Sequence, residues 1–317
     1  MNLEKEQLYQ IFNIKNTVII QELLSVAFGS KPALIFASDK EGAKIIKKIF
    51  PKLSIILEKP ELNIAHKINH LSLIVIAKNN KLAKSLIKTH INNNMMQIGE
   101  LLGYPSCCVN SWINRDYDTD SNKAIHKIYE NSRNFHFLNN NLFNFSSRLR
   151  VYKGMYKDIK KYYRKNNVFE PVIHNLQFIS HVPCSYDCKQ SKIIGEETYQ
   201  ILNNNLPEFS KQVKSILKRP VLFFDIFNWV IFDGLVNKDG VLKYKKVIPF
   251  ISLINSKLLN YFKEGNKIIV NNKSVEIFKD KKILYSYKKK NEVDGFILNF
   301  GNYKSFDISI YEKQKES

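Results

Sequence analysis

Apolar residues in the first ninety positions form short blocks, and the spacing within these blocks alternates between two patterns. Residues 1 to about 28 have the spacing of a helix. The later blocks predict strands at 32–37, 53–57 and 71–77 and helices at 39–50 and 80–91. Strands that alternate with helices are typical of a parallel sheet, so residues 1–91 predict a small parallel α/β domain.

Helical spacing dominates the next segment, and short alternating runs dominate the last. Helices are expected at 95–102, 121–137 and 185–203, so residues 92–256 predict a mostly helical domain. Turn residues then separate short strands expected at 267–270, 274–278, 283–287 and 295–298. These strands predict a small antiparallel β appendage over residues 257–317. The expected fold class is therefore α/β in the N-terminal part and α+β overall.

The four cysteines of this 317-residue chain all fall in two short motifs. The motifs are Gly103-Tyr104-Pro105-Ser106-Cys107-Cys108 and His181-Val182-Pro183-Cys184-Ser185-Tyr186-Asp187-Cys188. Cysteines that serve as small core hydrophobes would be scattered, so the clustering indicates a cysteine site. In a reducing compartment, clustered cysteines more often bind metal or act in catalysis than form structural disulfides.

Both motifs are expected at helix N-termini, where backbone N–H groups and the helix dipole favour a thiolate. Pro105 suits the first helical position, which places Cys107 and Cys108 in the first turn. If one helix includes both Cys184 and Cys188, their spacing puts the two sulfurs on the same face, one turn apart. We therefore expect the two motifs to converge on one anionic centre, although about seventy-five residues separate them.

The two motifs together resemble those of an uncharacterised prokaryotic family, classed as a domain of unknown function. The matching positions are Gly103, Tyr104, Pro105, Cys107, Cys108, Val109, His181, Pro183, Cys184, Ser185, Cys188 and Ser191. The resemblance extends from about residue 95 to residue 249. It implies a shared cysteine site, and it implies no particular reaction because that family has no established activity.

Three kinds of centre suit four cysteines. An iron–sulfur cluster, whose usual ligands are thiolates, is the cofactor expected first, and structural zinc is the alternative. The third is metal-free thiol chemistry with His181 as the base. A single zinc ion would hold the sulfurs within roughly 4 Å of one another, and a cluster would hold them a few Å further apart. Neighbouring helical side chains point about 100° apart, so we expect one of Cys107 and Cys108 as a ligand and the other as a reactive thiol.

The expected function is an enzyme of unassigned reaction built around a thiolate-bound metal site. The candidate metal and cofactor ligands are Cys107, Cys108, Cys184 and Cys188. The candidate catalytic residues are the polar side chains within the motifs, which are His181, Tyr104, Ser185 and Asp187. The alternative function is a non-enzymatic RNA-binding module in which a structural zinc ion holds the helices together.

A formal net charge of +20 suggests a polyanionic partner, so the expected substrate is a small molecule or RNA. The chain is rich in Lys, Ile and Asn together, and a proteome-wide composition bias would also produce this charge. Basic residues and tyrosines interleave most densely over Arg148–Lys165, a pattern that suits nucleic acid or a solvated amphipathic helix. We expect a cytoplasmic protein with no membrane partner, because neither a signal peptide nor a bilayer-spanning apolar run occurs.

Overall fold

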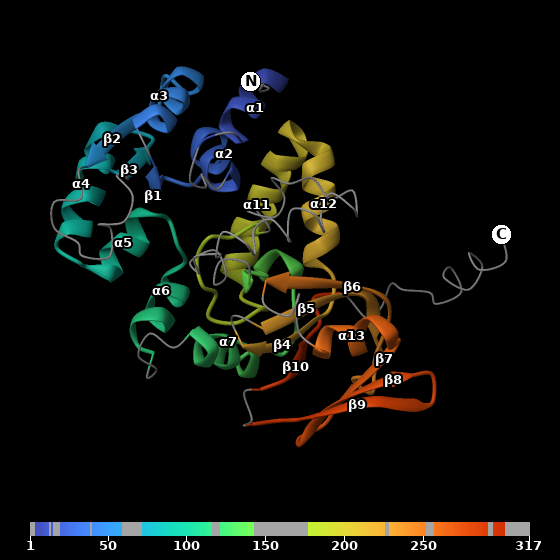
Figure 1. Ribbon diagram of the computed structural model, residues 1–317. Helices are drawn as coiled ribbons and strands as arrows, with labels where there is room; N and C mark the ends of the chain where they lie inside the picture. The colour runs from blue at the N-terminus through green and yellow to red at the C-terminus, as the bar shows by residue number, and fades with distance from the viewer. Residues whose placement is uncertain are drawn as a thin grey trace.

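The computed structural model has an α+β fold, which confirms the expected overall class (Figure 1). It describes residues 4–12, 14, 20–38, 40–58, 72–115, 121–142, 177–225, 228–251, 257–290 and 294–301. These residues contain one antiparallel sheet of three strands and another of seven. Within the same residues, no helix combines the length and the hydropathy needed to cross a bilayer.

The N-terminal part alternates strands and helices as the sequence predicts. Its elements are α1 (Lys5–Phe12), α2 (Ile20–Phe28), β1 (Ala33–Ser38), α3 (Lys40–Ile49), β2 (Ser54–Glu58), β3 (Ser72–Ala77) and α4 (Asn80–Ile91). The sequence supplies clear helix boundaries here: the Asn79 side chain accepts a hydrogen bond from the Leu82 N–H and caps α4. Each strand is therefore bracketed by residues that favour a helix start or a turn.

The prediction that this sheet is parallel is wrong. The strand order is β1-β3-β2, and both β1 and β2 pair with β3 in the antiparallel sense. Strands β1 and β2 do run in the same direction, as a strand–helix–strand unit should, but β3 lies between them. The alternating pattern predicts the relative direction of β1 and β2, and it contains nothing to show that a third strand occupies the position between them.

The described residues of the middle part form helices that are joined by loops, including the loop at residues 177–188. Its elements are α5 (Met95–Leu101), α6 (Ser106–Ile113), α7 (Ser121–Glu130), the 3-10 turn η2 (Phe137–Asn139), α11 (Lys189–Asn205) and α12 (Pro207–Leu217). Helix α7 is shorter than the expected 121–137. Its continuation is replaced by bonds to a distant loop, because the Arg133 N–H donates to Asp187 and the His136 N–H donates to the Tyr186 carbonyl.

The C-terminal part forms the seven-stranded sheet. Its elements are β4 (Val221–Asp225), β5 (Asn228–Val236), β6 (Leu242–Ile251), α13 (Lys257–Glu264), β7 (Lys267–Val270), β8 (Ser274–Lys279), β9 (Lys282–Lys288) and β10 (Phe296–Leu298). The strand order is β10-β4-β5-β6-β7-β8-β9, with every described pair antiparallel. The four strands expected after residue 257 are present, and the sheet extends across the boundary expected at residue 256 because β6 pairs with both β5 and β7.

Strand β4 is buried on both faces and joins two hydrophobic cores. Val221 and Phe223 pack into the larger core, which also contains residues of α2, α11 and α12, whereas Leu222 and Phe224 pack into the core beneath α13. Successive strand residues point to opposite faces, so one short apolar run serves both cores. The larger core reaches from the N-terminal helices to the C-terminal sheet and fixes the middle segment between them (Figure 1).

Gly195 sets the close approach of α11 to η2. A Cβ atom added at this buried glycine would lie 2.9 Å from the Leu138 Cβ and 3.1 Å from the Leu138 carbonyl oxygen. We predict that Gly195→Ala lowers the free energy of unfolding by about 1–3 kcal/mol through overpacking, although alanine is the better helix former. Urea unfolding measures this change.

Asn203→Ala is the matched control, because Asn203 is exposed on the same helix. This variant should be neutral or slightly stabilised through helix propensity alone. A Gly195→Ala protein as stable as the wild type would show that α11 does not depend on this contact.

Candidate metal centre

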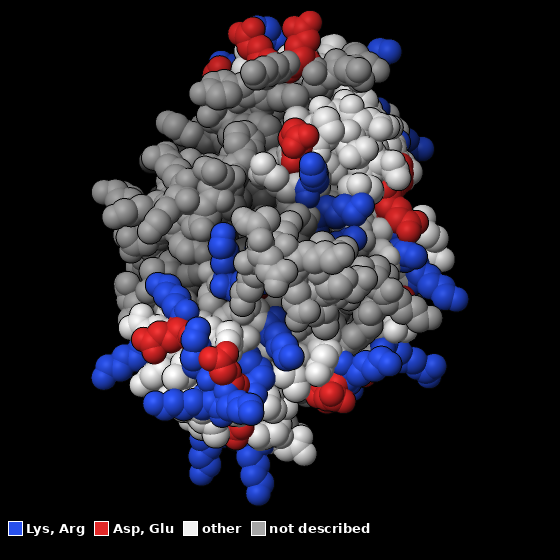
Figure 2. All heavy atoms as spheres, turned by 90° about the vertical axis from the view of Figure 1, so that its right-hand side faces the viewer, with Lys and Arg blue, Asp and Glu red and all other residues white. Residues whose placement is uncertain are grey.

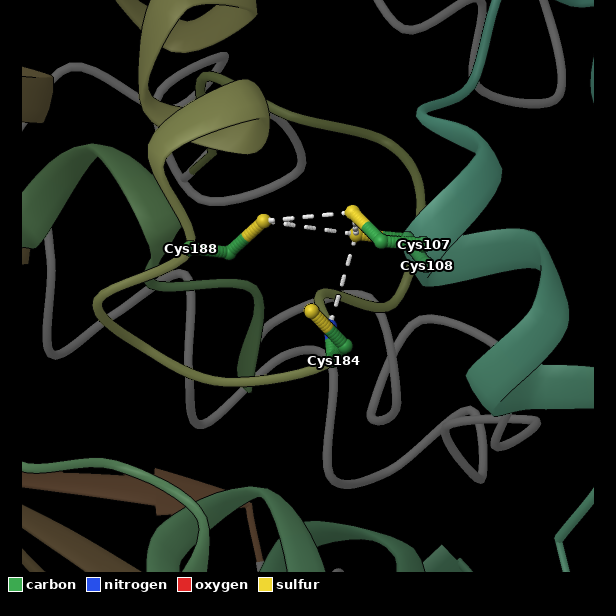
Figure 3. Close-up of side chains that lie close together, drawn as sticks. All are labelled: Cys107, Cys108, Cys184 and Cys188. Atoms are coloured by element: carbon green, nitrogen blue, oxygen red, sulfur yellow. Dashed lines mark hydrogen bonds between the residues drawn. The ribbon is translucent and has the colours of Figure 1, made fainter.

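All four cysteine sulfurs meet at one point (Figure 3). The sulfur of Cys107 lies 3.8 Å from that of Cys108, and both lie 3.7 Å from the sulfur of Cys188. With Cys184, the four ligand atoms lie within 4.8 Å of one another. The expected convergence of the two motifs is confirmed. The four residues form a group that could hold a metal ion, and we call it the cysteine centre.

The first motif adopts the expected local structure. The backbone leaves α5 through Gly103, whose φ of 76° lies in the left-handed region, and α6 begins after Pro105. Cys107 and Cys108 then fall in the first turn of α6. Both sulfurs reach the centre, so the expected division into one ligand and one outlying thiol does not follow from their positions.

The second motif does not adopt the expected helix. Helix α11 begins at Lys189, Cys188 is its N-cap residue, and Cys184 lies in a bend of the preceding loop. The prediction that Cys184 and Cys188 share one helical face is therefore wrong. The two sulfurs meet because the loop turns back on itself, and the Cys188 N–H donates to the Ser185 carbonyl within that turn.

Tyr186 explains why this segment is a loop. Its side chain is fully buried between Phe135 and Phe300, with ring centroids 5.7 and 5.0 Å away. Its N–H donates to the Ser132 hydroxyl, which lies 2.7 Å away on another segment. An N–H that donates to another segment is not available for a helical hydrogen bond, so the buried ring and the bond from the Tyr186 N–H keep this segment out of α11.

Three consecutive buried asparagines hold the same region in place. The Asn139 amide donates to the carbonyls of Tyr186 and Cys188 at 3.0 and 3.1 Å, and the Asn141 amide donates to the His181 carbonyl at 3.2 Å. Between them, Asn140 donates to the Leu217 carbonyl at the end of α12. Sequence reasoning missed these residues, because in an Asn-rich chain they resemble a polar connection rather than a buried scaffold.

A hydrogen-bonded chain connects His181 to the centre. Its Nε2 lies 2.6 Å from the Ser191 Oγ, which lies 3.2 Å from the Cys108 Sγ, and all three side chains are buried. Burial, with a smaller effect of the Lys31 cation, lowers the pKa of His181 to about 3, so the ring is neutral near pH 7. A neutral ring that donates from Nε2 to Ser191 lets the serine hydroxyl donate to the cysteine sulfur.

The sulfurs also affect one another's protonation. Hydrogen bonds from the thiols of Cys108 and Cys184 hold the pKa of Cys188 well below its usual value, and these shared protons raise the pKa of Cys108. Four thiolates this close would repel one another without a compensating cation. The lowered pKa of Cys188 favours at least one thiolate in the cysteine centre. A bound cation would remove the repulsion among further thiolates.

The remaining predicted catalytic residues have different surroundings. The Tyr104 ring lies beside the His181 ring, tilted by 38°, with the ring centroids 5.2 Å apart. Both rings form part of the wall of a cavity of about 110 Å³ between α2, α11 and the His181 loop. Asp187 accepts a hydrogen bond from the Arg133 N–H, and the Ser185 carbonyl accepts from Cys188. The structure thus gives Asp187 and Ser185 roles in the loop itself, and the catalytic roles of all four stay predictions.

Lys31 connects three segments next to this cavity. Its ammonium lies 3.0 Å from the Glu22 carboxylate, donates to the Leu102 carbonyl and the Ser180 hydroxyl, and lies over the Tyr104 ring. Desolvation by burial is the largest single effect and lowers the pKa of Lys31, but Glu22 and Tyr104 together raise it by more. The pKa of Lys31 is therefore raised and the side chain stays charged. The Arg148–Lys165 segment lies outside the described residues, so the structure does not address its expected role in nucleic-acid binding.

Ser191 is the residue through which the neutral histidine reaches Cys108. We predict that Ser191→Ala lowers the free energy of unfolding by about 1–3 kcal/mol, because it leaves the buried His181 Nε2 without its partner. Ser210→Ala is the matched control, since Ser210 is fully buried and its hydroxyl has no hydrogen-bond partner among the described residues. Equal urea midpoints for the two variants would contradict the assigned chain.

One protein-family model matches part of this chain. No curated protein and no solved structure matches it significantly. The family match covers a somewhat earlier range than the one expected from the motifs, and it includes both of them. Residues 60–214, just under half of the chain, match the family described as "Protein of unknown function (DUF483)".

Proposed function

We propose that the cysteine centre binds one zinc ion through four thiolates. The observation that carries this proposal is the set of sulfur–sulfur distances of 3.7–3.8 Å among Cys107, Cys108 and Cys188. A tetrahedron with zinc–sulfur bonds of 2.3 Å has edges of about 3.8 Å. The distances therefore suit a single ion without any rearrangement of the three side chains.

This geometry favours zinc over the iron–sulfur cluster that the sequence suggests first. A cluster places several iron atoms between its thiolate ligands and spreads the sulfurs a few Å further apart than a single ion does. The four sulfurs lie within 4.8 Å of one another, which is too compact for that spread. A reducing compartment, expected from the cysteine usage, would keep all four available as ligands.

The role that we propose for the ion is structural. Four protein thiolates complete the coordination shell of zinc and leave no open position for water or substrate, which is the pattern of structural sites. The ion would link the first turn of α6 to the loop before α11. We infer that the protein is a zinc-stabilised module, and RNA binding through Arg148–Lys165 remains a separate proposal.

Metal analysis and a cysteine variant test this function together. We predict one zinc per chain, and we predict that Cys188→Ser loses the metal and lowers the melting temperature by more than about 5 °C, because metal-binding energy is part of the folding energy. A strong chelator should lower the melting temperature of the wild type and leave that of the variant unchanged. Ser106→Ala, which changes an exposed residue of the first motif that is not a candidate ligand, is the control with full zinc content.

Two results would contradict the zinc proposal. A brown protein that contains stoichiometric iron and sulfide would show that the centre holds an iron–sulfur cluster and not zinc. Full zinc content in Cys188→Ser would show that Cys188 is not a ligand.

A second candidate function is catalysis in the cavity beside the centre. The observation in its favour is that His181 and Tyr104 share the wall of that cavity, and that His181 is coupled to Cys108 through Ser191. The cavity would hold a small polar molecule.

We predict that ligands found by an NMR screen of small polar metabolites bind about tenfold more weakly to Tyr104→Phe, which lacks one hydroxyl donor. A screen without hits, or hits that bind both proteins equally, would count against this function.

A further inference from the structure

The C-terminal sheet carries a large share of the positive charge. Residues 228–251 and 257–290 contain fourteen lysines and five acidic residues. Most of these lysines therefore cannot be neutralised within the segment. Figure 2 shows blue side chains outnumbering red ones at the lower end of the molecule, where Figure 1 places β7, β8 and β9.

Two pairs of lysines face each other directly across this sheet. Lys243 of β6 lies opposite Lys267 of β7, and Lys279 of β8 lies opposite Lys282 of β9. Like charges at directly opposed positions destabilise a sheet, so neither pair helps the fold. A contact between the Lys267 ammonium and the Phe278 ring offsets part of this cost at one pair only.

Strand β9 combines these charges with exposed apolar side chains. It is the last described strand in the sheet order, and Lys282 and Lys288 at its ends stand about 20 Å apart. Between them Ile283 is 52% exposed and Tyr285 is 36% exposed. The Tyr285 ring stacks on Tyr261 of α13 at 4.7 Å, which holds it in one orientation.

We propose that β9 and the adjoining lysines bind single-stranded nucleic acid. Lys279 and Lys282 would contact phosphates, because their partners in the register place them on the same face of the sheet as Tyr285. The fixed Tyr285 ring beside them would stack on a base, which is how sequence-tolerant single-strand sites work. An anionic membrane is the other polyanion to consider. Attachment to a membrane surface typically uses a helix with a broad apolar face, and this surface is a sheet edge with two exposed apolar side chains.

The lysines on β9 also have a simpler explanation, which is protection of the sheet edge. Lysines on an edge strand prevent it from pairing with another chain, so some positive charge there is expected even without a ligand. That protection requires no lysine on β6 or β7 and no fixed aromatic ring. The two explanations differ in what removal of the Lys279–Lys282 pair does to binding.

The test uses the full chain and a fluorescently labelled single-stranded RNA of about 12 nucleotides, with polarisation measured from about 50 to 200 mM salt. The double variant Lys279→Gln/Lys282→Gln should bind more weakly, with a salt slope smaller by about 1.4, and should melt at an equal or higher temperature. Tyr285→Ala should weaken binding about tenfold with a nearly unchanged salt slope.

The control Lys81→Gln/Lys84→Gln removes the same charge from exposed positions on α4, away from this sheet, and should bind like the wild type. If the control lost as much RNA affinity as the sheet variant, net charge alone would explain the weaker binding, and the proposal would be overturned. So would absence of RNA binding at low salt, or binding that survives the sheet variants and therefore belongs to another segment. Binding to phosphatidylserine vesicles without RNA binding would assign the surface to membranes. The metal content of every variant should be unchanged, which separates this test from that of the zinc site.

Discussion

Buried carbonyl groups without a helical partner need another donor, and this requirement organises the structure around the cysteine centre. In the loop before α11, the carbonyls of His181 and Tyr186 have no helical partner, and they accept bonds from the amides of Asn141 and Asn139. The Cys188 carbonyl accepts the first helical bond of α11 from the Lys192 N–H and a second bond from the Asn139 amide. Because these bonds fix the loop backbone, they also fix where Cys184 and Cys188 direct their sulfurs. The cysteine centre is thus held by a polar scaffold, with Cys108 and Cys188 buried and Cys107 exposed.

The sequence predicts the parts of the site that depend on composition and local capping. The concentration of every cysteine in two motifs predicts the convergence of the sulfurs, and Gly103 and Pro105 predict where α5 ends and α6 begins. Helix propensity fails at the second motif. The bonds that keep Ser185–Asp187 out of a helix come from Ser132 and Asn139, some fifty residues earlier, and local pattern does not contain such contacts.

In the two sheets, too, the local sequence pattern does not contain the contacts between distant segments. Period-two patterns and turn residues locate β7, β8 and β9 well, because each hairpin is local. The position of β3 between β1 and β2, and the inclusion of β4 to β6 in one large sheet, depend on pairing between distant segments. The positions of β1 to β3 and of β7 to β10 could therefore be predicted from the sequence. Strands β5 and β6, which lie in the segment expected to be mostly helical, and the strand neighbours required the structure.

The separation of the two motifs along the chain has a consequence for how the protein is made. Cys107 and Cys108 leave the ribosome eighty residues before Cys188, which at 5–20 residues per second is a delay of about 4–16 s. During that interval a nascent chain carries two adjacent thiols with no partners. Under the proposed function, the complete set of ligands forms only after α11 has begun to emerge. Zinc would then bind only to a chain whose first two cysteines have stayed reduced.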